Sequence, residues 1–321
     1  MAEPMYVEAL RDALREEMRK DSAVFVMGED ITRYGIGVCK GLIEEFGPER
    51  VRNTPISEGA IIGAAIGAAL RGMKPVVEIM YVDFILIGMD QIVNQAAKTI
   101  YLSHGELDLS LTIRVPEGTE WHGGGCQHSQ TFHSLFVNIP GLKIVIPSNP
   151  YDAKGLLKTA IQDKNPVLFF EHKQLYTQKG EVPKDEYTIP FGKAAIKREG
   201  KDITLIATSW MVRHALDVAE ELKNKVSIEV IDPRTLVPLD KHTIIKSVEK
   251  TGRVLVVDES PITGGVQGEI ISAILEEAFW NMEIPPRRLG AKNTPIPFNA
   301  RLEEEVIPTK EKIIKCILEM I

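Results

Sequence analysis

Cysteine is scarce in this sequence, and long uncharged stretches are missing from it. The chain of 321 residues has three cysteines, Cys39, Cys126 and Cys316. Thiols so far apart form no disulfide framework and suit a reducing compartment. The uncharged run near Ala60–Leu70 is well short of the ~20 residues that a membrane span needs. The charged segment Met1–Lys20 has no apolar signal-peptide core. The sequence therefore predicts a soluble, cytoplasmic protein that does not bind membranes.

Basic residues are also too few for a typical nucleic-acid-binding protein. Lysine and arginine total 38 against 45 aspartates and glutamates, which gives a net charge of −7. This balance argues against nucleic acid as a partner. The apolar content of 44% and the charged content of 26% are ordinary for a globular protein. The length allows two domains, each with a sizeable core.

A single carboxylate, Glu58, begins an apolar segment that carries no other charge until Arg71. Gly59, Gly63 and Gly67 follow at intervals of four, so on a helix they form one stripe. Glycine inside a helix costs ~1 kcal/mol relative to alanine, so the stripe predicts close approach of another backbone. Glu58 is then either a charge favoured by the helix dipole or an acid whose role the fold determines.

Strand and helix patterns alternate along the first half of the chain. Helices are expected at Tyr6–Lys20, Asp83–Ile100 and Asp152–Asp163, and strands at Ala23–Met27, Lys74–Met80, Leu109–Val115, Gly141–Pro147 and Val167–Glu171. The polar segment Tyr176–Pro190 interrupts the pattern, which resumes from Asp202–Thr208 to a closing helix at Thr309–Met320. We therefore predict an α/β fold with two domains, residues 1–190 and 191–321. Each should have a mainly parallel sheet flanked by helices.

The densest polar cluster follows the glycines at positions 123–125. One interpretation is a zinc site made by His122, Cys126, His128 and His133, but this spacing matches no common zinc arrangement. A cysteine nucleophile at Cys126 beside His128 is a second alternative. The crowding of Gln127–Gln130 after three glycines favours a third. In this reading, a flexible loop presents a histidine to a cleft as an acid, base or oxyanion partner.

With these residues in view, the chain resembles the beta subunit of a thiamine-diphosphate-dependent enzyme family. This subunit belongs to the decarboxylating first component of the pyruvate, branched-chain 2-oxoacid and acetoin dehydrogenase complexes. The resemblance runs nearly end to end and implies a transketolase-like pyrimidine-binding domain followed by a transketolase C-terminal domain. Its most specific segments are Gly28–Asp30, Thr54–Glu58, Asp90–Lys98, Gln127–Gln130, Pro147–Leu156 and Ile231–Asp240.

The resemblance also implies roles for individual residues. Glu58 would hydrogen-bond the aminopyrimidine of thiamine diphosphate and so promote loss of the thiazolium proton. Ile56, Met80 and Phe84 would hold the pyrimidine ring. His128 would lie near the reacting substrate and take part in reductive acylation of the lipoyl group.

Metal sites are implied as well, in this chain and outside it. Some family members hold potassium, mostly through backbone oxygens, at the positions of Leu111, Ala160, Ile161, Asp163 and Asn165. Thiamine enzymes hold Mg²⁺ on the diphosphate with a Gly-Asp-Gly segment, and this sequence contains none. The oxygen ligands for Mg²⁺ would then come from the alpha subunit, with the cofactor shared between the two chains.

The implied assembly is an α2β2 heterotetramer bound to a lipoyl-bearing dihydrolipoyl acyltransferase core. It would decarboxylate a 2-oxoacid or cleave acetoin and pass the acyl group to the lipoyl group. The segments Glu171–Tyr176 and Pro147–Pro150 favour the acetoin or pyruvate type. A branched-chain 2-oxoacid dehydrogenase beta subunit is the alternative.

Some residues depart from the family pattern. Glu120-Trp121-His122 replaces the small residues often found before Gln127–Gln130, which leaves the substrate open, and Asn293 stands where the family commonly has aspartate. A single-chain transketolase-like or deoxyxylulose-phosphate-synthase-like enzyme is disfavoured by the length and by the missing Gly-Asp-Gly segment. A non-catalytic scaffold subunit with the same fold is disfavoured by the presence of both Glu58 and His128.

Overall fold

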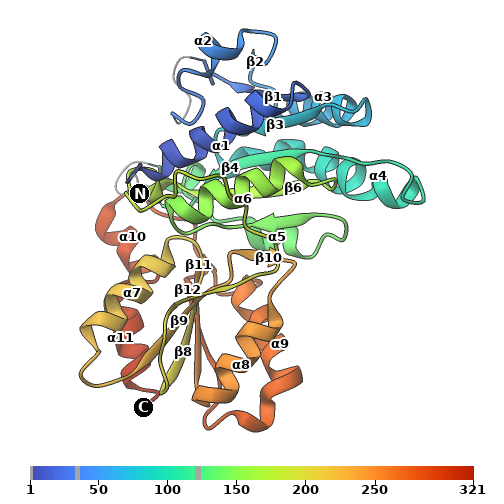
Figure 1. Cartoon of the computed structure of the whole chain (residues 1–321). Coiled ribbons are helices and arrows are strands. Elements are labelled where there is room, and N and C mark those ends of the chain that lie inside the picture. The colour runs from blue at the N-terminus through green and yellow to red at the C-terminus, as the bar shows by residue number, and fades with distance from the viewer. Residues whose placement is uncertain (1–2, 33–36, 120–123) are drawn as a thin grey trace.

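The computed structural model describes residues 3–32, 37–119 and 124–321 and has a sheet in each half of the chain (Figure 1). The first sheet has seven strands in the order β10-β5-β6-β4-β3-β1-β2, and the second has five in the order β12-β11-β8-β9-β7. Helices flank both sheets. The predicted α/β fold with mainly parallel sheets is therefore confirmed.

The first sheet is parallel except at one edge. Its strands are β1 (Val24–Glu29), β2 (Val51–Thr54), β3 (Lys74–Glu78), β4 (Thr112–Glu117), β5 (Lys143–Val145), β6 (Val167–His172) and β10 (Thr235–Val237). Residues alternate between the two faces. On β6, Val167 and Phe169 join one buried core, whereas Leu168 and Phe170 join the other. Burial on both faces is typical of parallel sheets.

The helices of the first half cover the two faces of this sheet. On one face lie α1 (Tyr6–Lys20) and α6 (Pro150–Gln162), which pack against each other. The core of the other face includes α3 (Glu58–Leu70), η1 (Val82–Gly88), η2 (Gln91–Ala96), α4 (Ala97–Leu102) and α5 (His133–Val137). A short α2 (Leu42–Phe46) precedes β2. The prediction of one continuous helix at Asp83–Ile100 is wrong, since the segment divides into a 3₁₀ helix, a π-helix and α4.

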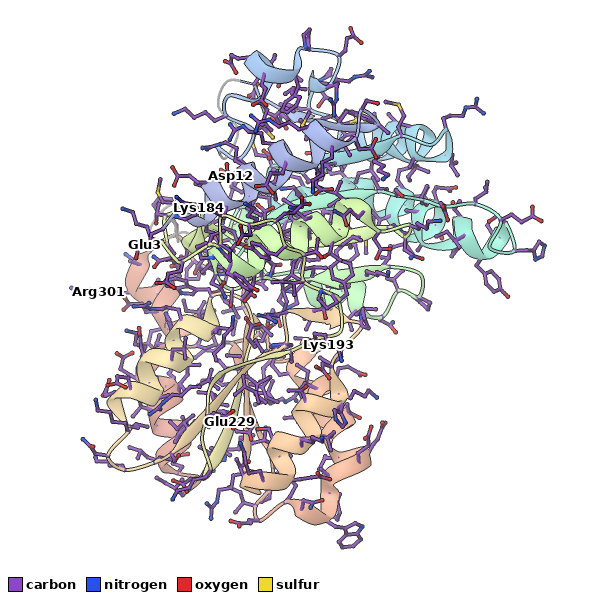
Figure 2. The ribbon with its side chains drawn as sticks, in the orientation of Figure 1. Glu3, Asp12, Lys184, Lys193, Glu229 and Arg301 are labelled. Carbon is purple, nitrogen blue, oxygen red and sulfur yellow. The ribbon has the colours of Figure 1, made fainter. Side chains whose placement is uncertain are left out.

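The second sheet comprises β7 (Ala195–Arg198), β8 (Ile203–Ala207), β9 (Ile228–Asp232), β11 (Val254–Pro261) and β12 (Arg287–Ala291). Figure 1 shows α7 (Met211–Glu221) and α11 (Lys310–Leu318) on one side of it, with α8 (Lys241–Thr251) and α9 (Val266–Ala278) on the other. A short α10 (Ala300–Val306) lies beside the first half. In Figure 2, Lys193 lies where the halves meet, and Glu229 lies within the second.

The two halves are connected by a strand pairing and by buried ion pairs as well as by the chain itself. Strand β10 follows residue 190 in the chain, yet it pairs antiparallel with β5 of the first sheet. Asp152 of α6 is fully buried and forms ion pairs with Lys197 and Arg234 of the second half. The domain boundary at residue 190 stays a prediction. The halves nevertheless meet through a buried and charged interface.

The glycine stripe of α3 faces this chain's own backbone in part. A Cβ added at Gly59 would lie 3.5 Å from the carbonyl oxygen of Ile87, and one at Gly63 would lie 3.4 Å from Oε1 of Gln91. At Gly67 an added Cβ would meet nothing within 4 Å. Of the three glycines, Gly59 therefore has another backbone at van der Waals distance, Gly63 has a side chain there, and Gly67 has neither. Within the described ranges, no helix combines the length and apolar character needed to cross a bilayer.

A buried arginine ties three neighbouring strands together. Arg114 on β4 is 1% exposed. Its guanidinium donates two hydrogen bonds to Glu171 on β6, of 2.7 and 2.8 Å, and one of 2.7 Å to Glu78 on β3. The hydroxyl of Tyr176 donates a further bond of 2.8 Å to Glu171. Burial still raises the pKa of Glu171 above its usual value, although Arg114 opposes the rise.

Replacing Arg114 should destabilise the protein, because two buried carboxylates lose their cation. Arg114→Leu leaves the carboxylates of Glu78 and Glu171 buried without a cation, so we expect a loss of about 3–5 kcal/mol in the free energy of unfolding at neutral pH. Burial already raises the pKa of Glu171, and loss of Arg114 removes the group that opposes this rise, so the loss should shrink as pH falls and Glu171 becomes protonated.

Urea unfolding of both proteins across a pH series measures this effect. Arg213→Leu is the matched control, because the Arg213 side chain is 59% exposed and, among the described residues, forms an ion pair with the nearby Asp217; it should cost at most about 1 kcal/mol. A loss for Arg114→Leu that equals the control, or that grows on acidification, would contradict this account of the core.

Candidate active site

The residues expected to form the site follow the carboxyl ends of adjacent parallel strands. Glu58 follows β2, Glu29 ends β1, Met80 follows β3, and the loop with His128 follows β4. The chain leaves β1 for β2 on one side and returns to β3 on the other side of β1. Ligands of open α/β sheets bind at such a switch in strand order. The topology thus places the candidate residues along one edge of the sheet.

Glu58 is a buried carboxylate at this edge. It is the first residue of α3 and is 5% exposed, and Ser57 before it contributes no side-chain cap. Within the described part of the chain, no hydrogen bond or ion pair to its side chain is present. The nearby charge is alike in sign: burial and then Glu58 raise the pKa of Glu29. The start of α3 favours a negative charge, but a carboxylate in this position is also suited to a ligand that donates a hydrogen bond.

Aromatic rings surround His128. The imidazole centre lies 4.7 Å from that of the Tyr81 ring and 5.4 Å from that of Phe84, with both rings nearly perpendicular to it. Tyr81 and Phe84 also contact each other edge to face at 6.0 Å. The structure therefore brings together two of the residues predicted from the sequence, Phe84 and His128, and adds Tyr81 in contact with both.

A cavity of about 640 Å³ opens beside these rings. Its walls come from three regions of the chain: the segment after β3, the loop after β4, and the C-terminal half. The described lining residues are Asp83, Phe84, Leu86, Cys126, Gln127, Gln130, Phe132, Pro261, Asn293, Thr294 and Pro295. The side chain of Asn293 donates a hydrogen bond of 2.7 Å to Thr263. Glu58, Ile56 and Met80 are not among the lining residues.

The loop with His128 is tied to the sheet by its backbone. Gly118, which follows β4, donates a 2.8 Å hydrogen bond to the carbonyl of Gln130. The Nζ of Lys173, which follows β6, donates to the carbonyl of His128 and lies over the Tyr81 ring, 5.2 Å from its centre. These bonds hold the backbone at His128 and two residues after it.

Other predicted residues lie further from this cavity. Ile56 is 75% exposed ahead of α3, so its role at the pyrimidine ring stays a prediction. Glu120-Trp121-His122 falls in a part of the chain outside the described residues. His133 was one of four residues in the zinc interpretation. Its two ring nitrogens contact carboxylate oxygens of Glu117 and Asp258, at 2.6 and 3.0 Å, and are not free for a shared metal.

The five residues assigned to potassium gather at the opposite edge of the sheet. The carbonyl of Leu111 accepts a 2.8 Å hydrogen bond from Val167, which begins β6, and that of Ala160 accepts one of 3.3 Å from Asp163. The carboxylate of Asp163 accepts hydrogen bonds from Asn165 and from the ammonium of Lys143. Ile161 lies in the last turn of α6. This turn could support the sheet but lies away from His128.

Sequence reasoning missed Tyr81 and Lys173 at the site. Tyr81 directly follows Met80, and Lys173 lies two residues after the predicted strand Val167–Glu171, so a position at a carboxyl edge was the available signal for both. The acids Glu117, Asp258 and Glu259 were missed for a different reason. They belong to the interface between the halves, which no local pattern reveals.

Comparison with known proteins matches each half of the chain to a transketolase domain family. Residues 2–179 match the family described as "Transketolase, pyrimidine binding domain", and residues 192–313 match "Transketolase, C-terminal domain". In Bacillus subtilis strain 168, the beta subunit of acetoin:2,6-dichlorophenolindophenol oxidoreductase is 44% identical over 98% of this chain and 96% of its own length. The 2-oxoisovalerate dehydrogenase subunit beta of the same organism is 45% identical over 98% of both chains.

A third relative and a solved structure extend the comparison. The pyruvate dehydrogenase E1 component subunit beta of Rickettsia felis is 43% identical over 97% of this chain and 96% of its own. The solved structure is a split-gene transketolase described as an inactive beta4 tetramer. It superposes with a TM-score of 0.79 at 22% identity, covering 99% of this chain and 98% of that one. At this identity the structural likeness shows the fold alone.

Gly118 should tolerate no side chain, because its backbone and its surroundings both forbid one. Its φ of 84° is in the left-handed region, and an added Cβ would lie 2.1 Å from Nε2 of His172. Gly118→Ala must therefore displace the His172 ring from Glu259, its 3.1 Å partner. Backbone strain alone costs about 1–2 kcal/mol of stability. Because Gly118→Ala also displaces the His172 ring, we expect its thermal midpoint to fall further than this strain alone would cause.

Gly105→Ala isolates the strain. Gly105 has a φ of 80°, and an added Cβ would meet nothing within 4 Å. Differential scanning calorimetry of the two variants separates the effects. Equal shifts in the two midpoints would show that the His172 ring does not limit position 118.

Proposed function

Because this chain belongs to the family of thiamine-diphosphate-dependent 2-oxoacid and acetoin dehydrogenase beta subunits, we propose that it forms half of such an active site. With an alpha subunit it decarboxylates a 2-oxoacid of the pyruvate type, or cleaves acetoin. The acyl product is then transferred reductively to the lipoyl group of an acyltransferase core. The observation that carries the proposal is the buried carboxylate of Glu58 at the switch in strand order.

The residues at this edge fit the pyrimidine end of the cofactor. Glu58 lacks a protein partner within the described ranges and lies near Glu29, whose pKa is raised. A ring nitrogen that shares a proton with Glu58 would relieve the cost of this buried charge. Phe84 offers an aromatic ring at the same edge. When bound, thiamine diphosphate supplies a nucleophilic carbon and accepts the electrons released by decarboxylation.

His128 is proposed to act on the substrate side of the site. Its ring is held between Tyr81 and Phe84, beside the cavity, and its carbonyl is bonded by Lys173. An imidazole so placed can hold or deliver a proton as the acyl group passes to a lipoyl sulfur. Support comes from the contact of the ring with Phe84, which lines the cavity, and from the match to the family's Gln-His-Ser-Gln segment.

The alpha subunit is proposed to complete the site in an α2β2 heterotetramer. The sequence has no Gly-Asp-Gly segment, so the partner would supply the oxygen ligands of Mg²⁺. Ile56, two residues before Glu58, and Ile87, whose carbonyl lies next to Gly59, are 75% and 64% exposed and offer apolar surface to that partner. Potassium is proposed at the turn of Leu111, Ala160, Ile161, Asp163 and Asn165, as a support for the sheet.

The choice of substrate is open among three kinds of relative. The acetoin, 2-oxoisovalerate and pyruvate enzymes named above are 43–45% identical to this chain, so identity favours none of them. The test is to produce the chain with the alpha subunit from its own source. Thiamine-dependent consumption of pyruvate, branched-chain 2-oxoacids and acetoin is then measured. Absence of activity on all three would overturn the proposed function and favour a non-catalytic scaffold.

Replacing the proposed acid tests its role directly. Glu58→Gln keeps the shape of the side chain but removes the negative charge, so we expect kcat of the assembled enzyme to fall by about a hundredfold or more. The thermal midpoint should stay the same or rise, because Glu29 no longer faces a like charge.

Glu106→Gln is the control. Glu106 is exposed and lies well after α3 in the sequence, so this variant should leave kcat unchanged. Steady-state kinetics and calorimetry of both variants provide the readouts. Wild-type turnover in Glu58→Gln would remove this residue from the mechanism.

A further inference from the structure

Two consecutive carboxylates of the second half contact both ends of the loop that carries His128. At its start, the backbone N–H of Thr119 donates a 2.8 Å hydrogen bond to Oε1 of Glu259. At its end, Nε2 of His133 lies 3.0 Å from Oδ2 of Asp258. Asp258 and Glu259 lie on β11, more than a hundred residues further along the chain. The loop is therefore fastened to the opposite half of the molecule.

His133 also contacts the first sheet, through Glu117. Its Nδ1 lies 2.6 Å from Oε1 of Glu117, the last residue of β4. The other oxygen of Glu117 accepts a 3.2 Å hydrogen bond from the backbone N–H of Phe132, which lines the cavity. His133, Glu117 and Asp258 are each about 1% exposed or less. The imidazole thus bridges a carboxylate of each half, one residue from the cavity wall.

Neighbouring groups shift the pKa values of His133 and Asp258 in opposite directions. Burial opposes a charge on His133, but Asp258 and Glu117 raise its pKa well above the usual value. Burial would also raise the pKa of Asp258; His133 and the hydroxyls of Ser260 and Thr208 instead lower it to about 2. The His133 ring therefore joins the two halves through the hydrogen bond of Nδ1 with Glu117 and the ion-pair contact of Nε2 with Asp258.

A second histidine reinforces the start of the loop. Nε2 of His172 lies 3.1 Å from Oε2 of Glu259, and this ring occupies the space beside Gly118. On its other face it stacks on Trp210, at 6.1 Å between ring centres. Its Nδ1 accepts a hydrogen bond from the backbone N–H of Gln174. Both ends of the loop are thus set by imidazole–carboxylate pairs at the interface between the halves.

Burying such charges costs desolvation energy, so stability alone is a weak reason for them. What they provide is a fixed geometry, because three charged groups with directional hydrogen bonds permit few arrangements. We propose that His133 is a positioning residue: bridged between Glu117 and Asp258, it fixes the loop so that the His128 ring keeps its place against Tyr81 and Phe84, next to the cavity. The proposal rests on the proposed function of His128 in acyl transfer to the lipoyl group.

The expected signature is selective loss of one step. A displaced His128 should slow acyl transfer to the lipoyl domain, whereas oxidation of the substrate with 2,6-dichlorophenolindophenol as acceptor bypasses the lipoyl group. A displacement of about 1 Å can cost up to a hundredfold in rate. His133→Gln in the assembled enzyme should therefore lower the lipoyl rate about tenfold or more relative to the dye-linked rate.

Two further variants keep the test decisive. Asp258→Asn preserves the shape of the carboxylate and can still bond Ser260 and Thr208, and it should lower the same ratio even if His133→Gln fails to fold. His214→Gln removes a histidine that is largely buried on α7 beside Trp210 and outside the bridge. It should leave the ratio of the two rates unchanged.

A measurement without activity reports the position of His128 itself. In the assembled enzyme without added cofactor, the rate at which diethyl pyrocarbonate modifies His128 is followed by peptide mass spectrometry. We expect it to change at least about threefold in His133→Gln and Asp258→Asn, but not in His214→Gln. An unchanged modification rate, or lipoyl and dye-linked rates that fall in equal proportion, would overturn the positioning role. Wild-type enzyme without any thiamine-dependent turnover would instead overturn the proposed function on which it rests.

Discussion

The carboxylate of Glu58 is the constraint around which the site is organised. The Glu58 residue is 5% exposed, its side chain has no hydrogen-bond partner among the described residues, and its charged neighbour, Glu29, is of like sign, so a donor from a ligand would suit it. At the start of α3, a Cβ added to Gly59 would lie 3.5 Å from the carbonyl oxygen of Ile87 in η1. The glycine stripe, which predicts close approach of another backbone, therefore meets a backbone of this chain at Gly59. Gly67 leaves the remainder of the stripe open to a partner.

The site also depends on how the two sheets meet. The carboxyl ends of β4 and β6 face those of β8 and β11, and the groups between them are charged and buried. Arg114 ties β3, β4 and β6 together beneath that edge, while His133 and His172 link its loop to Asp258 and Glu259. The cavity beside His128 is lined by both halves. A change in how the halves pack should therefore alter the active site even without touching its residues.

The fold and much of the site could be predicted from the sequence because their signals are local. Alternating strands and helices indicated the α/β class, and the short segments around Glu58 and His128 indicated the family. The single helix expected at Asp83–Ile100 was wrong, since periodicity does not distinguish α-helix from the 3₁₀ and π segments that tertiary packing imposes. The pairing of β10 with β5 and the contact of Thr119 with Glu259 join distant parts of the chain. No pattern within a short window reveals such contacts.

The central claim is that Glu58 belongs to half of a cofactor site that a second chain completes. The most direct measurement is calorimetric titration of thiamine diphosphate with Mg²⁺ into this chain alone, into the alpha subunit alone, and into their mixture. The account predicts saturable binding of the cofactor only in the mixture, and loss of affinity there when Glu58 is replaced by glutamine. Saturable binding to this chain alone, with the affinity of the mixture, would contradict it.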